Sequence, residues 1–373
     1  MPRVNLPVPL SASLSRPLSI SLSILLCLAA PAGLAAAYPA PLEGDATLRD
    51  FRFASGATVA ALRIHYRTLG TPARDSHGVV TNAVLITHGT GGTGAQFLRP
   101  EFAGELFGAG GLLDAGRYYI VLTDGIGHGQ SSKPSDGLHA RFPHYGYRDM
   151  VDAQRKVLDQ LGVNHLRLVM GTSMGGMQAW LWGERYPGFM DALMPLASLP
   201  TQVAGRNRAW RRVVIDAIRN DPQWQGGEYR VQPQSLRTGL QMLYFMGSNP
   251  ALRQQQSPTL AGTDQALDAY VAAAMKETDA TDLVYQLEAS SDYDPNPGLE
   301  SIRAPLLAVN SADDMINPPE LGILETEIKR VPRGSAVLLP FSAATRGHGS
   351  HTVATLWKPY LQRVLLQSEQ KAQ

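Results

Sequence analysis

The stretch Gly171–Gly175, with the sequence GTSMG, constrains the fold of this chain more than any other feature. An apolar run, HLRLVMG, leads into it, and an apolar helical pattern, MGGMQAWLWGERY, follows it. A serine between glycines at such a junction forms a sharp, strained turn that lifts its hydroxyl above the sheet edge. Side chains at the glycine positions would clash with the neighbouring strand and helix. The motif therefore predicts that Ser173 is a nucleophile at the amino end of a helix.

Apolar runs bounded by glycine, proline or aspartate recur on both sides of this turn. Such runs are typical of buried parallel strands, and the further examples are AVLITHG, YYIVLTD, ALMPLAS, PLLAVNS and AVLLPF. Upstream, residues 48–70 have the pattern of a hairpin with Ser55 and Gly56 at its turn. Eight strands with intervening helices predict an α/β fold with a doubly wound, mostly parallel sheet.

About 105 residues separate the strand that ends at Ser198 from the strand that begins at Pro305. Apolar residues at helical spacing begin this interval, which predicts a helical cap between the sixth and seventh strands; they are Trp210, Val213, Val214, Ala217 and Ile218. Most of the nearby arginines we interpret as the solvated face of that helix; they are Arg206, Arg208, Arg211, Arg212 and Arg219. We expect a signal peptide over residues 1–37 and a helical cap over residues 199–300. The α/β core consists of residues 38–198 together with residues 301–373.

A serine hydroxyl needs a base to become a nucleophile, and two later segments supply candidates. AVNSADDMINPPE carries Asp313 and Asp314 at the end of a strand, and RGHGSHTVATLW carries His348 and His351 after the last strand. This order of serine, acid and histidine places all three at the ends of strands where such sheets bind ligands. The histidine would take the serine proton, and the carboxylate would orient the imidazole. The residues alone do not decide which of the two aspartates is the acid or which of the two histidines is the base.

Backbone N–H groups must stabilise the negative oxygen that forms during attack on a carbonyl. The residue after the nucleophile supplies one candidate, the N–H of Met174, and the loop THGTGG supplies Thr90 as the other. We interpret His88 in that loop as a buried brace. The nine histidines are scattered without H-E-x-x-H or paired Cys/His spacing, and no G-x-G-x-x-G follows a strand. We therefore expect neither a metal nor another cofactor.

The first 37 residues differ in composition from the rest of the chain. Arg3 and Arg16 are their only charges, and the apolar stretch LSISLSILLCLAA leads to three alanines before Tyr38. This pattern predicts a signal peptide cleaved near Ala37/Tyr38, a periplasmic or secreted protein, and no stable membrane insertion after cleavage. A retained membrane anchor is the alternative. The net charge of +1 gives no argument for a nucleic-acid partner, and we expect none.

Several segments together resemble the α/β-hydrolase superfamily, and most of all the homoserine O-acetyltransferase-like family within it. They occur in family order between about residues 47 and 366, and are DGIGHGQS, SMGGMQA, DPQWQGGEY, DDMINPPE and GHGSHTVA. The resemblance implies an eight-stranded α/β-hydrolase fold with a cap. It assigns the nucleophile to Ser173, the acid to Asp314 and the base to His348. It also implies that two copies of the chain pair through their caps.

The departures from the family lie in the predicted cap. Ile215 and Asp216 stand where the family has Arg-Gln, and YVAAAMKETDATDL lacks the family's Arg-Tyr-Gln-Gly segment. Acyl-CoA and homoserine are cytoplasmic, so an exported transferase would lack both. We therefore expect a serine hydrolase that takes a small-molecule acyl substrate and passes the acyl group to water. An acyltransferase and a catalytically silent binding protein are the alternatives.

Overall fold

The computed structural model describes residues 38–369, and the predicted signal peptide lies outside the described residues. A single eight-stranded sheet forms the centre, with the strands in the order β1-β2-β4-β3-β5-β6-β7-β8. Only β2 runs opposite to the others, so the sheet is mostly parallel, as predicted. The strands are β1 Leu42–Arg52, β2 Thr58–Leu69, β3 Ala83–Thr87, β4 Tyr119–Thr123, β5 Leu168–Thr172, β6 Leu193–Leu196, β7 Leu306–Ser311 and β8 Gly334–Leu339.

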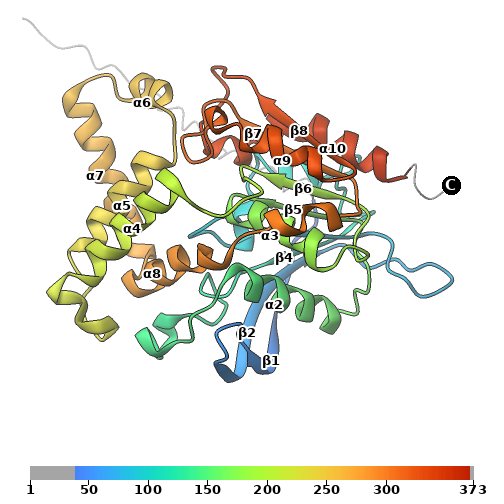
Figure 1. The fold of residues 1–373 in the computed structure, drawn as a ribbon, viewed down its shortest axis with the longest axis horizontal. Coiled ribbons are helices and arrows are strands. Elements are labelled where there is room, and N and C mark those ends of the chain that lie inside the picture. The colour runs from blue at the N-terminus through green and yellow to red at the C-terminus, as the bar shows by residue number, and fades with distance from the viewer. Residues whose placement is uncertain (1–37, 370–373) are drawn as a thin grey trace, which may run out of the picture. The chain divides into compact units, whose positions relative to one another are not determined.

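Helices cover both faces of this sheet (Figure 1). Strands β3, β4 and β5 are buried along their whole length because apolar side chains fill both of their faces. One face packs against α2 (Tyr147–Gln160) and α3 (Met174–Arg185), and the other against α1 (Ala103–Leu106) and α10 (Ala354–Glu369). Helix α9 (Ile323–Glu327) lies between β7 and β8 in the chain. No helix in the described part of the chain is long and apolar enough to cross a membrane.

Short 3-10 helices connect many of these elements. They are η1 Gly94–Leu98, η2 Pro134–Asp136, η3 His139–Arg141, η4 Pro222–Gly227, η5 Ala289–Asp292, η6 Asn296–Ser301, η7 Pro319–Leu321, η8 Ile328–Arg330 and η9 Gly349–Thr352. The loops that contain η1 and η9 follow strands β3 and β8, at the edge of the sheet where the parallel strands end. Residues from distant parts of the sequence therefore meet at this edge.

The interval between β6 and β7 forms five α-helices, which group at one side of the sheet in Figure 1. They are α4 Gly205–Arg219, α5 Ser235–Met246, α6 Pro250–Gln256, α7 Leu260–Glu277 and α8 Ala280–Glu288. These helices bury an apolar cluster of their own. A Cβ built on Gly239 of α5 would lie 2.9 Å from Val214, so glycine lets α4 and α5 approach closely. We refer to this segment as the cap.

The buried face of α4 differs in part from the predicted stripe. Trp210, Val214 and Ile218 are buried as expected, but Val213 is 49% exposed. Arg211 is only 2% exposed, so the prediction that most of the arginines form the solvated face is wrong for this residue. Its guanidinium lies 4.9 Å from the Trp210 ring, and its Nε donates to Asn207 Oδ1 at 3.1 Å. Stacking and a long apolar stem make this burial feasible.

Helix α8 joins the cap to the core through a buried carboxylate. Asp282 accepts hydrogen bonds from the backbone N–H of Ser135 at 2.9 Å and from its hydroxyl at 2.6 Å. Burial raises the pKa of Asp282 to about 6, although the bonds from Ser135 oppose the shift. Nearby, Gln286 Nε2 donates to the carbonyl of Gly127 at 2.8 Å. The cap is thus hydrogen-bonded to loops of the core that follow β4.

This carboxylate makes the stability of the protein depend on pH. The folded-state pKa exceeds the unfolded value of about 4, so ionisation of Asp282 disfavours folding above pH 6, and the penalty disappears as the pH falls. We expect the free energy of unfolding of the wild type, relative to Asp282→Asn, to rise by about 1 kcal/mol from pH 7 to pH 5. Urea denaturation at both pH values measures this difference. A difference that is flat with pH would contradict the assignment.

Candidate active site

The turn from β5 into α3 has the strained backbone that the motif predicts. Ser173 adopts φ 56° and ψ −112°, a backbone conformation that residues other than glycine rarely occupy. Its backbone N–H donates to the carbonyl of Leu196 on the neighbouring strand β6 at 2.9 Å. Met174 begins helix α3, so its N–H belongs to the first turn, where no intrahelical acceptor exists. The hydroxyl of Ser173 and this N–H therefore lie at the same end of the helix.

The glycines around Ser173 allow the close approach of neighbouring backbone. A Cβ on Gly171 would lie 2.2 Å from the carbonyl oxygen of Gly175, and one on Gly175 would lie 2.0 Å from that of Thr87. A Cβ on Gly176 would lie 2.4 Å from the carbonyl oxygen of Leu196. The predicted clash with the neighbouring strands and helix is confirmed.

The same contacts predict a large loss of stability for a single added methyl group. We expect Gly175→Ala to lower the free energy of unfolding by about 3 kcal/mol or more, because the displaced atoms are backbone of β3 and cannot rotate away. Gly188→Ala is the matched control, since no heavy atom lies within 4 Å of its added Cβ. Denaturant unfolding of both variants measures the effect. Equal stabilities would refute this account of the turn.

His348 lies between Ser173 and Asp314 and is hydrogen-bonded to both. The distance from His348 Nε2 to Ser173 Oγ is 2.8 Å, and that from His348 Nδ1 to Asp314 Oδ2 is also 2.8 Å. Ser173 and His348 are each 8% exposed, and Asp314 is 2% exposed. The structure therefore brings together one member of each pair that the sequence left open. This geometry allows the imidazole to accept the serine proton while its Nδ1–H remains bound to the carboxylate.

Asp314 is held as a carboxylate by its surroundings. Its Oδ1 accepts from the N–H groups of Ile316 at 2.7 Å and Asn317 at 3.1 Å, and its Oδ2 accepts from Asn317 Nδ2 at 3.1 Å. Burial alone would raise the pKa of Asp314, but the charge of His348 and these hydrogen bonds outweigh it and lower the pKa. The acid therefore stays ionised at neutral pH.

The two alternates, His351 and Asp313, occupy different places. The ring of His351 packs edge-on against that of His348, with centroids 5.2 Å apart, and its buried Nδ1 has no partner among the described residues. Burial and the neighbouring His348 lower the pKa of His351 to about 3, so it is neutral at physiological pH. Asp313 accepts hydrogen bonds from Asn249 and from the backbone of Gly347. Neither residue takes a place in the hydrogen-bonded chain from Ser173.

The loop after β3 passes directly beside Ser173. A Cβ on Gly89 would lie 3.5 Å from Ser173 Cβ, and Thr90 follows it on the turn. The hydroxyl of Thr90 is buried and has no partner among the described residues. Thr90 thus lies in a loop that reaches Ser173, and Met174 directly follows Ser173 at the start of α3. The role of their N–H groups as oxyanion donors stays a prediction.

Two buried histidines support these loops. His88 Nδ1 donates to the carbonyl of Gly89 at 2.8 Å, and its Nε2 accepts from the N–H of Gly125 at 2.8 Å. Burial lowers the pKa of His88, in keeping with a neutral ring. The interpretation of His88 as a brace is confirmed. His128 packs edge-on against it at 5.0 Å, and burial lowers its pKa to about 3.

One supporting group was missed by the sequence analysis. Asp124 ends the run YYIVLTD, and its carboxylate accepts from the N–H of Gly94 at 2.8 Å and from that of Gln130 at 3.0 Å. Arg67 Nη1 contacts the same carboxylate at 3.0 Å, so the ion pair is buried and fully bonded. An aspartate directly before a glycine-rich loop at a strand end was the available signal. Asp124 fixes both glycine-rich loops next to the site.

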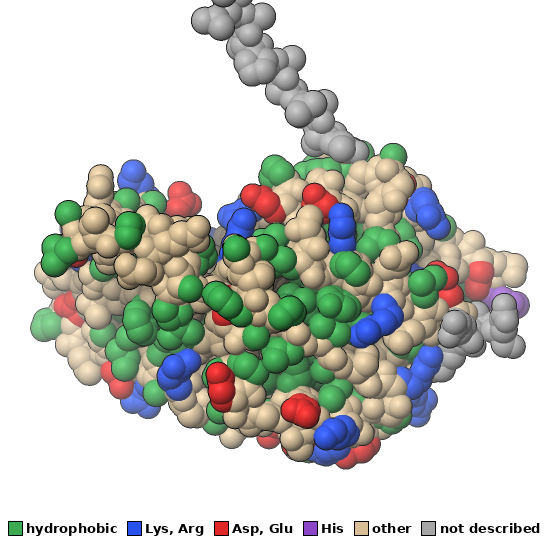
Figure 2. Space-filling view, turned by 90° about the horizontal axis from the view of Figure 1, so that it is seen from above, with side chains coloured by type: hydrophobic (Ala, Val, Ile, Leu, Met, Phe, Trp, Pro, Cys, Tyr) green, Lys and Arg blue, Asp and Glu red, His purple; other side chains and the backbone are tan. Residues whose placement is uncertain are grey.

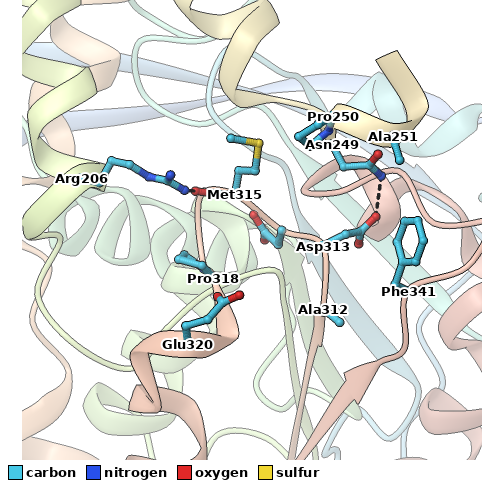
Figure 3. Close-up of a pocket in the computed structure, with 11 residues that line it drawn as sticks. Arg206, Asn249, Pro250, Ala251, Ala312, Asp313, Met315, Pro318, Glu320 and Phe341 are labelled. Atoms are coloured by element: carbon cyan, nitrogen blue, oxygen red, sulfur yellow. Dashed lines mark hydrogen bonds between the residues drawn. The ribbon is translucent and has the colours of Figure 1, made fainter. Parts of the chain in front are cut away.

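An open cleft of about 590 Å³ lies beside the acid-bearing loop, between that loop and the start of α6 (Figure 3). Arg206 of the cap extends across it and donates to the carbonyl of Met315. On the opposite side, Asn249 of the cap points at Asp313. Within residues 38–369, no group of three or more His, Cys, Asp or Glu side chains could hold a metal ion.

Comparison with known protein families places this fold. A family model described as the alpha/beta hydrolase fold matches residues 82–333. The chain is an α/β-hydrolase. A curated relative from Methanothermobacter thermautotrophicus, named as a probable acyltransferase, is 30% identical over 299 residues, which cover 78% of this chain and 88% of the relative. A homoserine O-acetyltransferase from Geotalea daltonii is 34% identical over 215 residues, covering 53% and 56%. This α/β-hydrolase is therefore close to the homoserine O-acetyltransferase-like family, as the motifs predicted.

Solved structures of two activities resemble this α/β-hydrolase almost equally. Esterase E22 superposes with a TM-score of 0.77 at 20% identity, covering 87% of this chain and 100% of the esterase. A homoserine O-acetyltransferase from Bacillus anthracis superposes with a TM-score of 0.76 at 20% identity, covering 87% and 97%. At this identity the likeness establishes the fold alone. Hydrolases and acyltransferases share it, so the choice of acceptor must be argued from this chain's own residues.

Proposed function

We propose that the protein is an exported serine hydrolase that cleaves an ester or related acyl bond through an acyl-enzyme on Ser173. The observation that carries the proposal is the hydrogen-bonded chain from Ser173 through His348 to Asp314. A silent binding protein would not require a strained serine, a base and an ionised acid in line. The proposed substrate is a small-molecule acyl compound.

The proposed reaction has two halves. As Ser173 Oγ attacks the carbonyl carbon, His348 Nε2 takes its proton, and the negative oxygen accepts hydrogen bonds from the N–H groups of Met174 and Thr90. His348 then gives the proton to the leaving alcohol, which departs as the acyl-enzyme forms. A water molecule then attacks the acyl-enzyme while His348 takes its proton. As the bond between the acyl carbon and Ser173 Oγ breaks, His348 returns the proton to Oγ, which releases the acid and restores the free serine. Asp314 stabilises the imidazolium in both halves.

We infer that water is the acceptor because this chain departs from the transferase pattern in the cap and its first 37 residues have the pattern of an export signal. Ile215 is a buried apolar residue of α4 where the family has arginine. An apolar side chain provides no hydrogen bond for a charged acceptor. Outside the cytoplasm, water is also the acceptor that is always present.

An acyltransferase is the second candidate, favoured by the names of the curated relatives. The two functions are distinguished with one purified protein and two assays. We expect release of acetate from p-nitrophenyl acetate and from other short esters, and no O-acetylhomoserine when acetyl-CoA and homoserine are supplied. Acetylhomoserine formed faster than free acetate would overturn the hydrolase proposal.

The location forms part of the same proposal. Expression of the full chain in a bacterial host, followed by fractionation and mass spectrometry, tests it. We expect a periplasmic or secreted protein whose first residue is Tyr38. A protein that stays in the cytoplasm with residues 1–37 attached would remove the export argument and favour the transferase.

We also propose that two copies pair through their caps. Large apolar side chains are exposed on the cap; they are Val213, Val231, Phe245, Leu260 and Tyr270. Figure 2 shows one face on which apolar side chains are exposed and charges of both signs are intermixed. Large apolar side chains that are left exposed are available for burial in a protein contact. Light scattering of the wild type and of Phe245→Asp tests the pairing, and a monomeric wild type would refute it.

A further inference from the structure

Asp313, the neighbour of the catalytic acid, joins three segments of the chain. Its Oδ2 accepts from the backbone N–H of Gly347 at 2.9 Å and from Asn249 Nδ2 at 2.5 Å. Its Oδ1 accepts from the hydroxyl of Ser311 at the end of β7. Both carboxylate oxygens are therefore occupied by donors from the sheet, the cap and the histidine loop. Figure 3 shows the bond to Asn249 at the edge of the open cleft.

The cap also packs directly against the histidine loop at this point. Gly347 has φ +61°, and a Cβ there would lie 2.9 Å from the backbone nitrogen of Asn249 and 2.9 Å from the carbonyl carbon of Ser248. The backbone of the turn between α5 and α6 thus lies against the residue before His348. Asn249 has a second role, because its Oδ1 accepts from the N–H of Leu252 at the start of α6.

We propose that Asp313 is a positioning residue that fixes His348 through the N–H of Gly347, and that Asn249 couples this position to the cap. The proposal rests on the proposed function in one respect, since it takes His348 as the base that activates Ser173. The imidazole must point at Ser173 Oγ and at Asp314 Oδ2 at once, so a small rotation of the loop breaks both bonds. The carboxylate of Asp313 prevents this rotation by bonding the adjacent peptide.

The bonds of Asp313 exclude a direct part in proton transfer. Asp313 donates and accepts nothing at the imidazole, and its partners are a hydroxyl, an amide and a peptide N–H. An asparagine at this position can keep its oxygen on Gly347 and Asn249 and turn its amide towards the Ser311 oxygen. The geometry therefore points to a requirement for the hydrogen bonds of the Asp313 side chain more than for its negative charge. In this respect Asp313 differs from Asp314.

Three variants of the full protein test the proposal by the rate at which a fluorophosphonate probe labels Ser173. We expect Asp313→Ala to slow labelling and lower kcat by about 10- to 100-fold with little change in KM, because the base is misplaced by a fraction of an ångström. Asp313→Asn should stay within about threefold of the wild type. Asn249→Ser keeps an oxygen that can cap α6 but loses the reach to Asp313, and should slow labelling by a smaller factor than Asp313→Ala.

The control is Thr259→Ala, which removes the bond from Gly262 N–H that caps α7, elsewhere in the cap. Its labelling rate should equal that of the wild type. If Thr259→Ala slows labelling as much as Asp313→Ala, general loosening of the cap explains the effect and the proposal falls. If Asp313→Asn is as inactive as Asp314→Asn, the charge of Asp313 takes part in the chemistry and the positioning role is wrong.

A second measurement judges Asp313 without any reaction. The low-field NMR proton on His348 Nδ1, bonded to Asp314, reports the position of the ring in the resting protein. We expect this resonance to broaden and exchange faster with water in Asp313→Ala and to be preserved in Asp313→Asn. An unchanged resonance in Asp313→Ala overturns the proposal. A wild type that the probe does not label would instead overturn the proposed function, while the resonance still decides the role of Asp313.

Discussion

Ser173→Ala is expected to lower the rate of ester hydrolysis by about six orders of magnitude in kcat, because the acyl-enzyme cannot form without the hydroxyl. The residual rate should remain above that of uncatalysed hydrolysis, since the predicted oxyanion donors, the N–H groups of Met174 and Thr90, are unchanged by the substitution. KM should change little because the lost atom acts in the transition state. Initial rates with p-nitrophenyl acetate measure both constants.

The same substitution should abolish labelling by a fluorophosphonate while leaving the fold intact. Alanine at this position keeps the strained φ of 56° and loses only the bond to His348 Nε2, so thermal unfolding should be near that of the wild type. A variant that retains hydrolysis or labelling would move the nucleophile elsewhere and end the proposal for Ser173. The fluorophosphonate test also separates the enzyme from a silent binding protein.

The catalytic turn could be predicted from the sequence because its chemistry and its sterics use the same few residues. Gly171 and Gly175 are required by carbonyl groups within 2.2 Å of an added Cβ, and this requirement appears directly in the motif. The apolar strands could also be predicted from the sequence, because β3, β4 and β5 are buried along their whole length and are therefore apolar throughout. The three residues meet because parallel strands end at one edge of the sheet, and their order of serine, acid and histidine is the one expected for this fold.

The contacts around that turn could not be predicted, because they join residues that are far apart in the sequence. Asp313 and Asp314 are adjacent and chemically identical, yet one bonds the imidazole and the other bonds Asn249 and Gly347. The resemblance to a family chose between them, and spacing alone did not. Arg211 is a different case, since its partners Trp210 and Asn207 are close to it in the sequence and the sequence does not show that they bury it. The charge of Arg211 predicted an exposed side chain, but its contact with the Trp210 ring accompanies a buried one.

Comparison of sequences and folds does not determine which acceptor takes the acyl group, so this choice depends on the residues of the cap in this chain. An esterase and an acetyltransferase superpose on the structure with TM-scores of 0.77 and 0.76, so the arrangement of the elements does not choose the acceptor. The cap contacts the core at Asp282, Arg206 and Asn249, and the last two contact the loop that carries the acid. We therefore expect the position of the cap and the positions of Ser173, His348 and Asp314 to be coupled through a few hydrogen bonds.

Asp314→Asn should lower kcat by about four orders of magnitude without unfolding the protein, whereas Asp313→Asn should have little effect. The backbone N–H groups of Ile316 and Asn317 donate to Oδ1 of Asp314, so the oxygen of an asparagine would take that place. Its amide would then face His348 Nδ1, and two donors would oppose each other. The imidazole would adopt the tautomer with its proton on Nε2, which cannot accept the proton of Ser173.

The comparison of the two substitutions decides which aspartate serves the histidine, by rates on p-nitrophenyl acetate and by the tautomer of His348 read from imidazole nitrogen shifts. The lowered pKa of Asp314 keeps the wild-type carboxylate ionised well below neutral pH, so its protonation should not cause a loss of activity between pH 5 and pH 7. If Asp314→Asn hydrolysed the ester at the wild-type rate, another acid would have to orient His348. Among the described residues, Asp313 is hydrogen-bonded to Ser311, Asn249 and Gly347 and not to His348, so equal losses in both variants would contradict its positioning role and give its charge a part in the chemistry.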